Sequence, residues 1–241
     1  MISQEVHDDM LDVNEPNLYD ESIRSINYYD YTPQTQANNN NCGHQIKIDI
    51  NAQDIYTLPS KSYISIKGQI RRLDNNTAYV ATDEIALINN AGVKYELNGT
   101  TIESINYPGQ TTSMLGYLSY PDDSTGLSFC WNKDTSDNAN SSEFSSSQAA
   151  PAAGYIPGKN PQYNKGFAVR KGFLFSSDPL GCFEFHIPLS HIFGFAEYKK
   201  VIYGMKHTLT LTRGSDNAAL HRNATSVDGK IDLTSISWYM P

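Results

Sequence analysis

The chain has 241 residues, of which 39% are hydrophobic, and it carries a formal net charge of −8. This length can bury a sizeable core in one large all-β domain or in two small ones. The acidic balance argues against a nucleic-acid reader, which would carry a basic stripe, and against a protein that binds anionic membranes. The longest apolar runs are also far shorter than the roughly 20 residues that insert into a bilayer as a helix.

Residues 1–44 are predicted to form an acidic, flexible N-terminal arm. Eight acids and one base precede Lys47, a net charge of −7, whereas the remaining 18 acids and 17 bases sum to −1. The segment is polar and shows no sustained hydrophobic period, which is typical of disorder. The alternative is an arm that becomes ordered on a neighbouring subunit, with Tyr28, Tyr29 and Tyr31 as its aromatic anchors.

The start of the chain lacks the basic and apolar regions of a signal peptide. Its cysteines, Cys42, Cys130 and Cys182, are odd in number and far apart. We therefore expect free thiols in a reducing compartment.

Alternating apolar and polar side chains predict strands in the first half of the body. Ile46, Ile48 and Ile50 show the pattern most clearly. Asn98-Gly99 is a strong hairpin signal, because a type I′ turn needs two residues with positive φ. The predicted strands are 45–50, 61–70, 84–97 and 100–105.

The pattern changes after Pro108-Gly109. Met114, Leu115 and Leu118 have helical spacing, which predicts a short helix over 111–120 with a threonine cap at 111 or 112. Residues 121–165 are rich in Ser, Asn, Ala and Pro, so we expect a long polar surface loop. The order of its part 124–164 stays open, either mobile or an interaction site, and an exposed Trp131 would mark an interface.

Strands are predicted again at 166–175, 182–188, 206–213 and 229–238. The link from Pro188 to Lys206 is too long for a tight hairpin, which indicates a Greek-key crossover between opposite sheets. A bulge near Thr234 or Ser235 would bring Ile231 and Trp238 to one face. Eight strands with a short helical insertion predict an all-β fold: a jelly-roll sandwich of two antiparallel sheets over 45–241.

Side chains suited to chemistry are few. The sequence has no nucleotide-binding or hydrolase motif, so we expect no catalytic residue, no cofactor and no enzyme activity. Cys182, His186 and His191 are a weak metal candidate, and we expect a small thiol and two imidazoles instead. His207 is in phase with Leu209 and Leu211, so we expect a structural histidine with a hydrogen-bond partner in the core.

Several long stretches resemble one protein family. They are YISIKGQI (63–70), IALINNAGVKYELNGTTIES (85–104), YPGQTTSMLGYLSYPDD (107–123), FEFHIPLSHIFGF (183–195), VIYGMKHTLTLTR (201–213), SDNAAL (215–220) and GKIDLTSISWYMP (229–241). They resemble the N-terminal jelly-roll half of the double jelly-roll, hexon-like major capsid proteins of Polinton/Maverick elements, adintoviruses and related viruses.

The resemblance implies a structural virion protein, made in the host cytoplasm or nucleus, that builds the icosahedral shell of a double-stranded DNA virus or virus-like transposon. In that family two tandem jelly rolls form each subunit and three copies form a capsomer. This sequence corresponds to one roll, which is either the N-terminal half alone or a protein that uses a single roll. The implied partners are other copies of the chain and other capsid proteins, with no specific nucleic acid and no membrane insertion. We expect subunit contacts at Tyr28, Tyr29, Tyr31, Trp131 and Tyr239. The alternative is a lectin-like jelly roll that binds glycans through aromatic loop residues.

Overall fold

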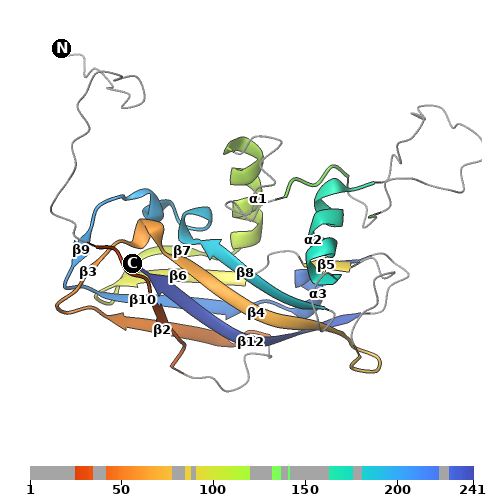
Figure 1. Cartoon of the computed structure of the whole chain (residues 1–241), viewed down its shortest axis with the longest axis horizontal. Coiled ribbons are helices and arrows are strands. Elements are labelled where there is room, and N and C mark those ends of the chain that lie inside the picture. Colours follow the sequence, from red (N-terminus) through yellow and green to blue (C-terminus); the bar gives the residue numbers. More distant parts are fainter. Residues whose placement is uncertain are drawn as a thin grey trace, which may run out of the picture.

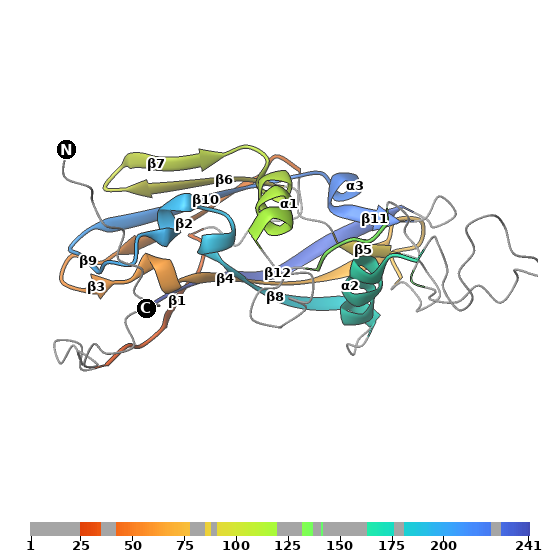
Figure 2. The same cartoon turned by 90° about the horizontal axis from the view of Figure 1, so that it is seen from above.

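Two antiparallel four-stranded sheets, packed face to face, form the body of the molecule (Figures 1 and 2). The computed structural model describes residues 25–34, 42–77, 85–87, 91–119, 132–136, 141, 163–175, 181–222 and 228–241. The β12 sheet has the order β1-β12-β4-β8, and the β10 sheet has the order β2-β10-β6-β7. Their strands are β1 Tyr29–Tyr31, β2 Gln45–Asn51, β4 Tyr63–Arg72, β6 Ala91–Leu97, β7 Thr100–Ile105, β8 Cys182–Pro188, β10 Lys206–Arg213 and β12 Gly229–Met240.

The order of these strands identifies the fold. Counted along the chain, they form one sheet of order 1-8-3-6 and another of order 2-7-4-5. The chain crosses between the sheets at every step except the β6–β7 hairpin, which gives the two Greek keys of a jelly roll. The predicted fold class, an all-β jelly-roll sandwich of two antiparallel sheets, is therefore confirmed.

Smaller elements lie in the connections. The short strands β3 (Tyr56–Thr57) and β9 (Ile202–Tyr203) pair with each other, as do β5 (Ile85–Leu87) and β11 (Leu220–Arg222). The helices are α1 Pro108–Ser119, α2 Lys165–Phe175 and α3 Asp216–Ala219, and the 3₁₀ turns are η1 Pro59–Lys61, η2 Leu189–His191 and η3 Gly194–Glu197. Both α1 and α2 stand on the side of the sandwich where β7 and β8 lie (Figure 1). No helix in the described ranges has the length and apolar content to cross a membrane.

The core fills the space between the sheets. Ile46, Ile48 and Ile50 of β2 point inward, as their alternation predicts, and they meet Ile64 and Trp238 from the β12 sheet. A second buried cluster lies where α2 packs on the β12 sheet, and it comprises Ile70, Leu174, Phe183, Leu220 and Ile231. Burying such side chains is the main favourable contribution to folding.

Two local predictions are confirmed. The ladder between β12 and β4 shifts register between Leu233 and Ser235, so that Ile231 and Trp238 are both buried. The strand opposite needs glycine there, since a Cβ on Gly68 would lie 2.6 Å from a ring carbon of Phe183. In the β6–β7 hairpin, Asn98 and Gly99 have φ of 47° and 79°, as a type I′ turn requires.

The prediction of a strand at 166–175 is wrong, because these residues form α2. Phe167, Lys171 and Leu174 are buried at helical spacing. Asn164 caps the helix: its Oδ1 accepts from the Phe167 N–H (3.1 Å), and its Nδ2 donates to the Ser136 carbonyl (2.7 Å). An asparagine directly before the first turn is the helix-start signal that the strand prediction missed.

Other boundaries also differ from the prediction. Tyr29–Tyr31, assigned to the flexible arm 1–44, form β1 and pair with β12. The predicted strand 84–97 is two strands, β5 and β6, which belong to different sheets. The predicted helix begins at Pro108 and not at a threonine cap, since proline fits the first helical position. Most of the predicted loop 121–165 lies outside the described residues.

Replacing Asn164 with alanine is expected to lower the free energy of unfolding by about 2 kcal/mol, because the helix loses its cap and the Ser136 carbonyl loses the hydrogen bond from the buried Asn164 amide. Urea denaturation would measure the change. Asn164→Ser keeps a capping oxygen and should lose about half as much. An alanine variant as stable as the original protein would show that this side chain does not hold α2 in place.

Candidate subunit-contact surfaces

An aromatic cluster covers part of the outer face of the β12 sheet. The Tyr63 and Tyr239 rings stack with centroids 4.8 Å apart, and the Tyr28 ring lies 5.8 Å from that of Tyr63. The His186 ring meets Tyr63 edge-on at 5.5 Å. These residues come from neighbouring strands β12, β4 and β8 and from the segment before β1, so the sheet register itself places them together.

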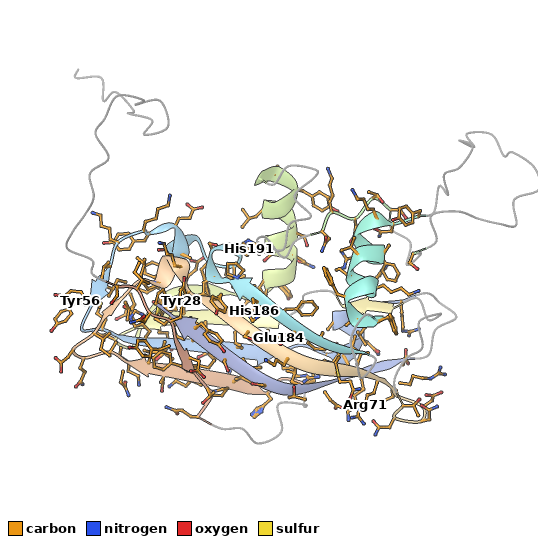
Figure 3. The ribbon with its side chains drawn as sticks, in the orientation of Figure 1. Tyr28, Tyr56, Arg71, Glu184, His186 and His191 are labelled. Carbon is orange, nitrogen blue, oxygen red and sulfur yellow. The ribbon has the colours of Figure 1, made fainter. Side chains whose placement is uncertain are left out.

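Charged side chains continue this face along β4 and β8. Lys67 Nζ lies 2.8 Å from Glu184 Oε1, and His186 Nε2 lies 3.6 Å from the same oxygen. The hydrogen bond and charge of Glu184 raise the pKa of Lys67. Figure 3 shows Glu184 and His186 side by side on β8. Aromatic residues are enriched at protein–protein interfaces, whereas lysine and glutamate are depleted there, so the aromatic part of this face is the better candidate for a subunit contact.

The predicted contact residues divide by exposure. Tyr28 and Tyr29 are exposed, and Tyr239 is half-buried beneath its ring contacts. Tyr31 packs against the main core instead, and burial, with a smaller contribution from Tyr29, raises the pKa of its hydroxyl. Trp131 lies outside the described residues. Tyr28 and Tyr239 thus share one surface, the aromatic cluster. Tyr63 also belongs to this cluster, although it was not among the predicted contact residues.

Helix α1 presents its large apolar side chains outward. Leu118 is 86% exposed and Met114 is 68% exposed, and Tyr107, Leu115 and Tyr117 are exposed as well. The residues of α1 that face the sandwich are small. Pro108, Gly109 and Gly116 are buried, and Thr112 Oγ1 donates a hydrogen bond to the His191 carbonyl. The helical spacing predicted the helix correctly but did not show that its apolar residues face away from the sandwich.

A third exposed apolar surface lies at one end of the sandwich, around the ladder of β3 and β9. The Tyr56 and Tyr203 rings pair across this ladder with centroids 4.6 Å apart, and Tyr56 is 68% exposed (Figure 3). We call this surface the β3–β9 end; it comprises Ile55, Tyr56, Tyr198, Val201, Tyr203 and Met205, all of them exposed. Ile55 and Tyr56 were not among the predicted contact residues, although apolar residues between two predicted strands are a signal for an exposed loop surface.

His207 has the buried hydrogen-bond partners that its strand phase predicts. It is fully buried, with Nε2 2.9 Å from Thr57 Oγ1 and Nδ1 2.7 Å from the Tyr95 hydroxyl. Thr57 Oγ1 donates its proton to the Ile202 carbonyl, so it accepts from Nε2–H and leaves Nδ1 to accept from Tyr95. Burial lowers the pKa of His207 to about 4, and burial raises the pKa of Tyr95. The chain of bonds is structural, since each of its members is used within the core.

The residues of the weak metal candidate do not form a ligand set. Cys182 and His186 lie on β8, whereas His191 is buried in η2 beyond Pro188. Across the ranges that the structure describes, no three His, Cys, Asp or Glu side chains are grouped as metal ligands.

Comparison with family models covers the last third of the chain. A family model described as a double jelly roll-like domain matches residues 166–241, which contain α2, β8, β10 and β12. No curated protein matches the chain. The match and the strand order together support a double jelly-roll fold family, whose domains are typical of viral capsid proteins.

Proposed function

We propose that this chain is a major capsid subunit that assembles the shell of a double-stranded DNA virus or a virus-like transposon. The observation that carries the proposal is the jelly-roll strand order, in a chain whose residues 166–241 match the double jelly roll-like domain. This domain family is in general structural and not enzymatic. The chain would act as a virion protein whose partners are its own copies, in a trimeric capsomer, and other capsid proteins.

The proposed mechanism is mechanical. Two packed sheets make a stiff body, and weak contacts at several surfaces are repeated by symmetry until a closed assembly is stable. Three exposed surfaces support this role: the aromatic cluster of the β12 sheet, the apolar side of α1 and the β3–β9 end. Contiguous exposed apolar patches on a protein surface often mark sites of protein–protein contact.

Light scattering and negative-stain microscopy of the purified full chain test the proposal. We expect particles of capsomer size, or shells, whose proportion rises with protein concentration. A single monomeric species at high concentration would contradict the capsid role.

Replacing Leu118 with glutamate is expected to weaken assembly roughly tenfold or more, because a charge would enter the apolar side of α1. The free energy of unfolding should change by less than about 0.5 kcal/mol, since the residue is exposed. Leu73→Glu is the matched control, because Leu73 is also an exposed leucine but lies after β4, away from α1. Equal assembly of Leu118→Glu and Leu73→Glu would show that α1 is not a contact surface.

Glycan binding is the alternative function, and the exposed Tyr56 and Tyr203 rings are the residues that favour it. Connections between the main strands of a sandwich often carry binding residues, and β3 and β9 lie in such connections. A glycan array separates the two functions, because selective binding that is lost in Tyr56→Ala would favour the lectin-like module over the capsid subunit.

A further inference from the structure

The β3–β9 end combines exposed apolar groups with exposed lysines. Lys199 and Lys200 lie between Tyr198 and Val201 in the chain, and both are exposed. Lys61 is exposed in the neighbouring turn η1, and Lys206, directly after Met205, is exposed and pairs with Asp49. The other acids at this end are Asp54 and Glu197, both exposed. Four lysines against three acids leave this end slightly basic, in a protein whose net charge is −8. A matching partner would therefore be acidic and partly apolar.

The first 24 residues of the chain have this composition. They contain seven acids and one base, Arg24, a net charge of −6. Apolar residues are distributed among the acids: Ile2, Val6, Met10, Leu11, Val13, Leu18, Tyr19 and Ile23. A segment of this kind has too little apolar content to fold alone, but it can bind an apolar surface that is bordered by lysines.

The described chain begins at the same end of the molecule as the β3–β9 end. The described chain begins at Ser25, on the side where β3 and β9 lie in both views (Figures 1 and 2). Tyr28 is held there by its contact with Tyr63, which follows η1 and β3 in the chain. Twenty-four extended residues reach about 80 Å, which is enough to cross to an adjacent subunit.

We propose that residues 1–24 of one subunit bind the β3–β9 end of a second copy of this chain. The inference rests on the proposed function, because it needs subunits side by side with their axes roughly parallel. In that arrangement the arm of each subunit lies next to the β3–β9 end of its neighbour. An arm-to-end contact joins two different surfaces, so repeating it by rotation produces a closed ring.

Zero-length cross-linking tests the contact directly. A carbodiimide joins a carboxylate to a lysine amine only where the two groups touch, and mixing ¹⁴N- and ¹⁵N-labelled full chains distinguishes contacts between subunits from contacts within one. We expect cross-links between arm carboxylates and Lys199 or Lys200 in mixed-isotope pairs. Lys165, which is exposed at the start of α2, is the control and should not cross-link to the arm.

Each other outcome overturns the proposal. Same-isotope cross-links alone would show that the arm binds its own subunit, and equal cross-linking to Lys165 would show non-specific attraction. Capsomers without any arm cross-link would overturn arm binding and leave the capsid role intact. The absence of both capsomers and cross-links would count against both inferences.

Charge exchange provides the second measurement. Lys199→Glu with Lys200→Glu, or Asp8→Lys with Asp9→Lys, should each weaken association roughly tenfold at low salt. Combining all four changes should restore association to within about threefold of the original protein. If the combined variant associates as weakly as the sum of the two separate losses predicts, the ion pairing is overturned. Lys165→Glu changes the charge by the same amount as Lys199→Glu, and it should not change the strength of association.

Discussion

Replacing Trp238 with alanine is expected to lower the free energy of unfolding by about 3–5 kcal/mol. Trp238 is fully buried between the two sheets, on β12, which lies between β1 and β4. Its ring meets the Tyr95 ring of the β10 sheet edge-on, with centroids 6.1 Å apart. Alanine would therefore leave a cavity at a point where the two sheets contact each other. Urea denaturation of the original and the variant protein measures the difference.

Trp238→Phe is the matched control. Trp238 Nε1 is buried without a hydrogen-bond partner among the described residues, and phenylalanine removes this N–H together with part of the ring. The lost packing is thus partly offset by the loss of an unsatisfied polar group, and we expect a cost of only about 1 kcal/mol. A Trp238→Ala variant within 1 kcal/mol of the original protein would contradict a core centred on this residue.

The parts of the fold that sequence reasoning found are those fixed by local pattern. Ile46, Ile48 and Ile50 alternate because one face of β2 is buried, and Asn98-Gly99 forms a turn that few other residue pairs allow. The bulge near Thr234 was predictable because Ile231 and Trp238 cannot face the same core without an extra residue between them.

The missed elements depend on distant partners. Tyr29–Tyr31 form a strand of three residues in an acidic stretch, and β1 is stabilised by pairing with Trp238–Met240, about 200 positions away in the chain. The apolar residues of segment 166–175 show a weak alternation that is compatible with a strand. The contacts of Asn164 with residues 135 and 136 favour a helix instead. Local sequence carries little information on either set of contacts.

The candidate surfaces were the least predictable part. Met114 and Leu118 of α1 have the same apolar spacing as residues of a buried helix, so their spacing does not distinguish a core from a contact surface. The aromatic cluster needs the register that places Tyr239 opposite Tyr63, and a single-residue shift would separate the rings. Tyr28 and Tyr239 were predicted as separate contact residues. The β12–β4 ladder places Tyr239 against Tyr63, and the Tyr28 ring also contacts Tyr63.

Acidification is expected to destabilise the protein by about 3 kcal/mol through His207 alone. The pKa of His207 is about 4 in the fold, against an ordinary value of 6.5, and each unit of difference corresponds to about 1.4 kcal/mol. The unfolded chain binds the proton first as the pH falls, so the contribution is complete above pH 6.5 and is lost between pH 6.5 and about 4. Below that range both states are protonated and His207 causes no further loss.

His207→Gln isolates this contribution. A glutamine side chain can accept from the Tyr95 hydroxyl and donate to Thr57 Oγ1, but it does not titrate. Burial also lowers the pKa of His191, but that residue is present in both proteins, so the difference between their stability curves reports His207. Asp49 contributes to stability down to a lower pH. Burial would raise the pKa of its carboxyl, but the Thr208 hydrogen bond and the charges of Lys47 and Lys206 hold this pKa below 3.8. The contribution of Asp49 is therefore lost only as the pH falls below that value. Urea denaturation at pH 7, 5.5 and 4 should give curves that converge as the pH falls; parallel curves would mean that the pKa of His207 is the same in the folded and unfolded protein, so that burial does not lower it.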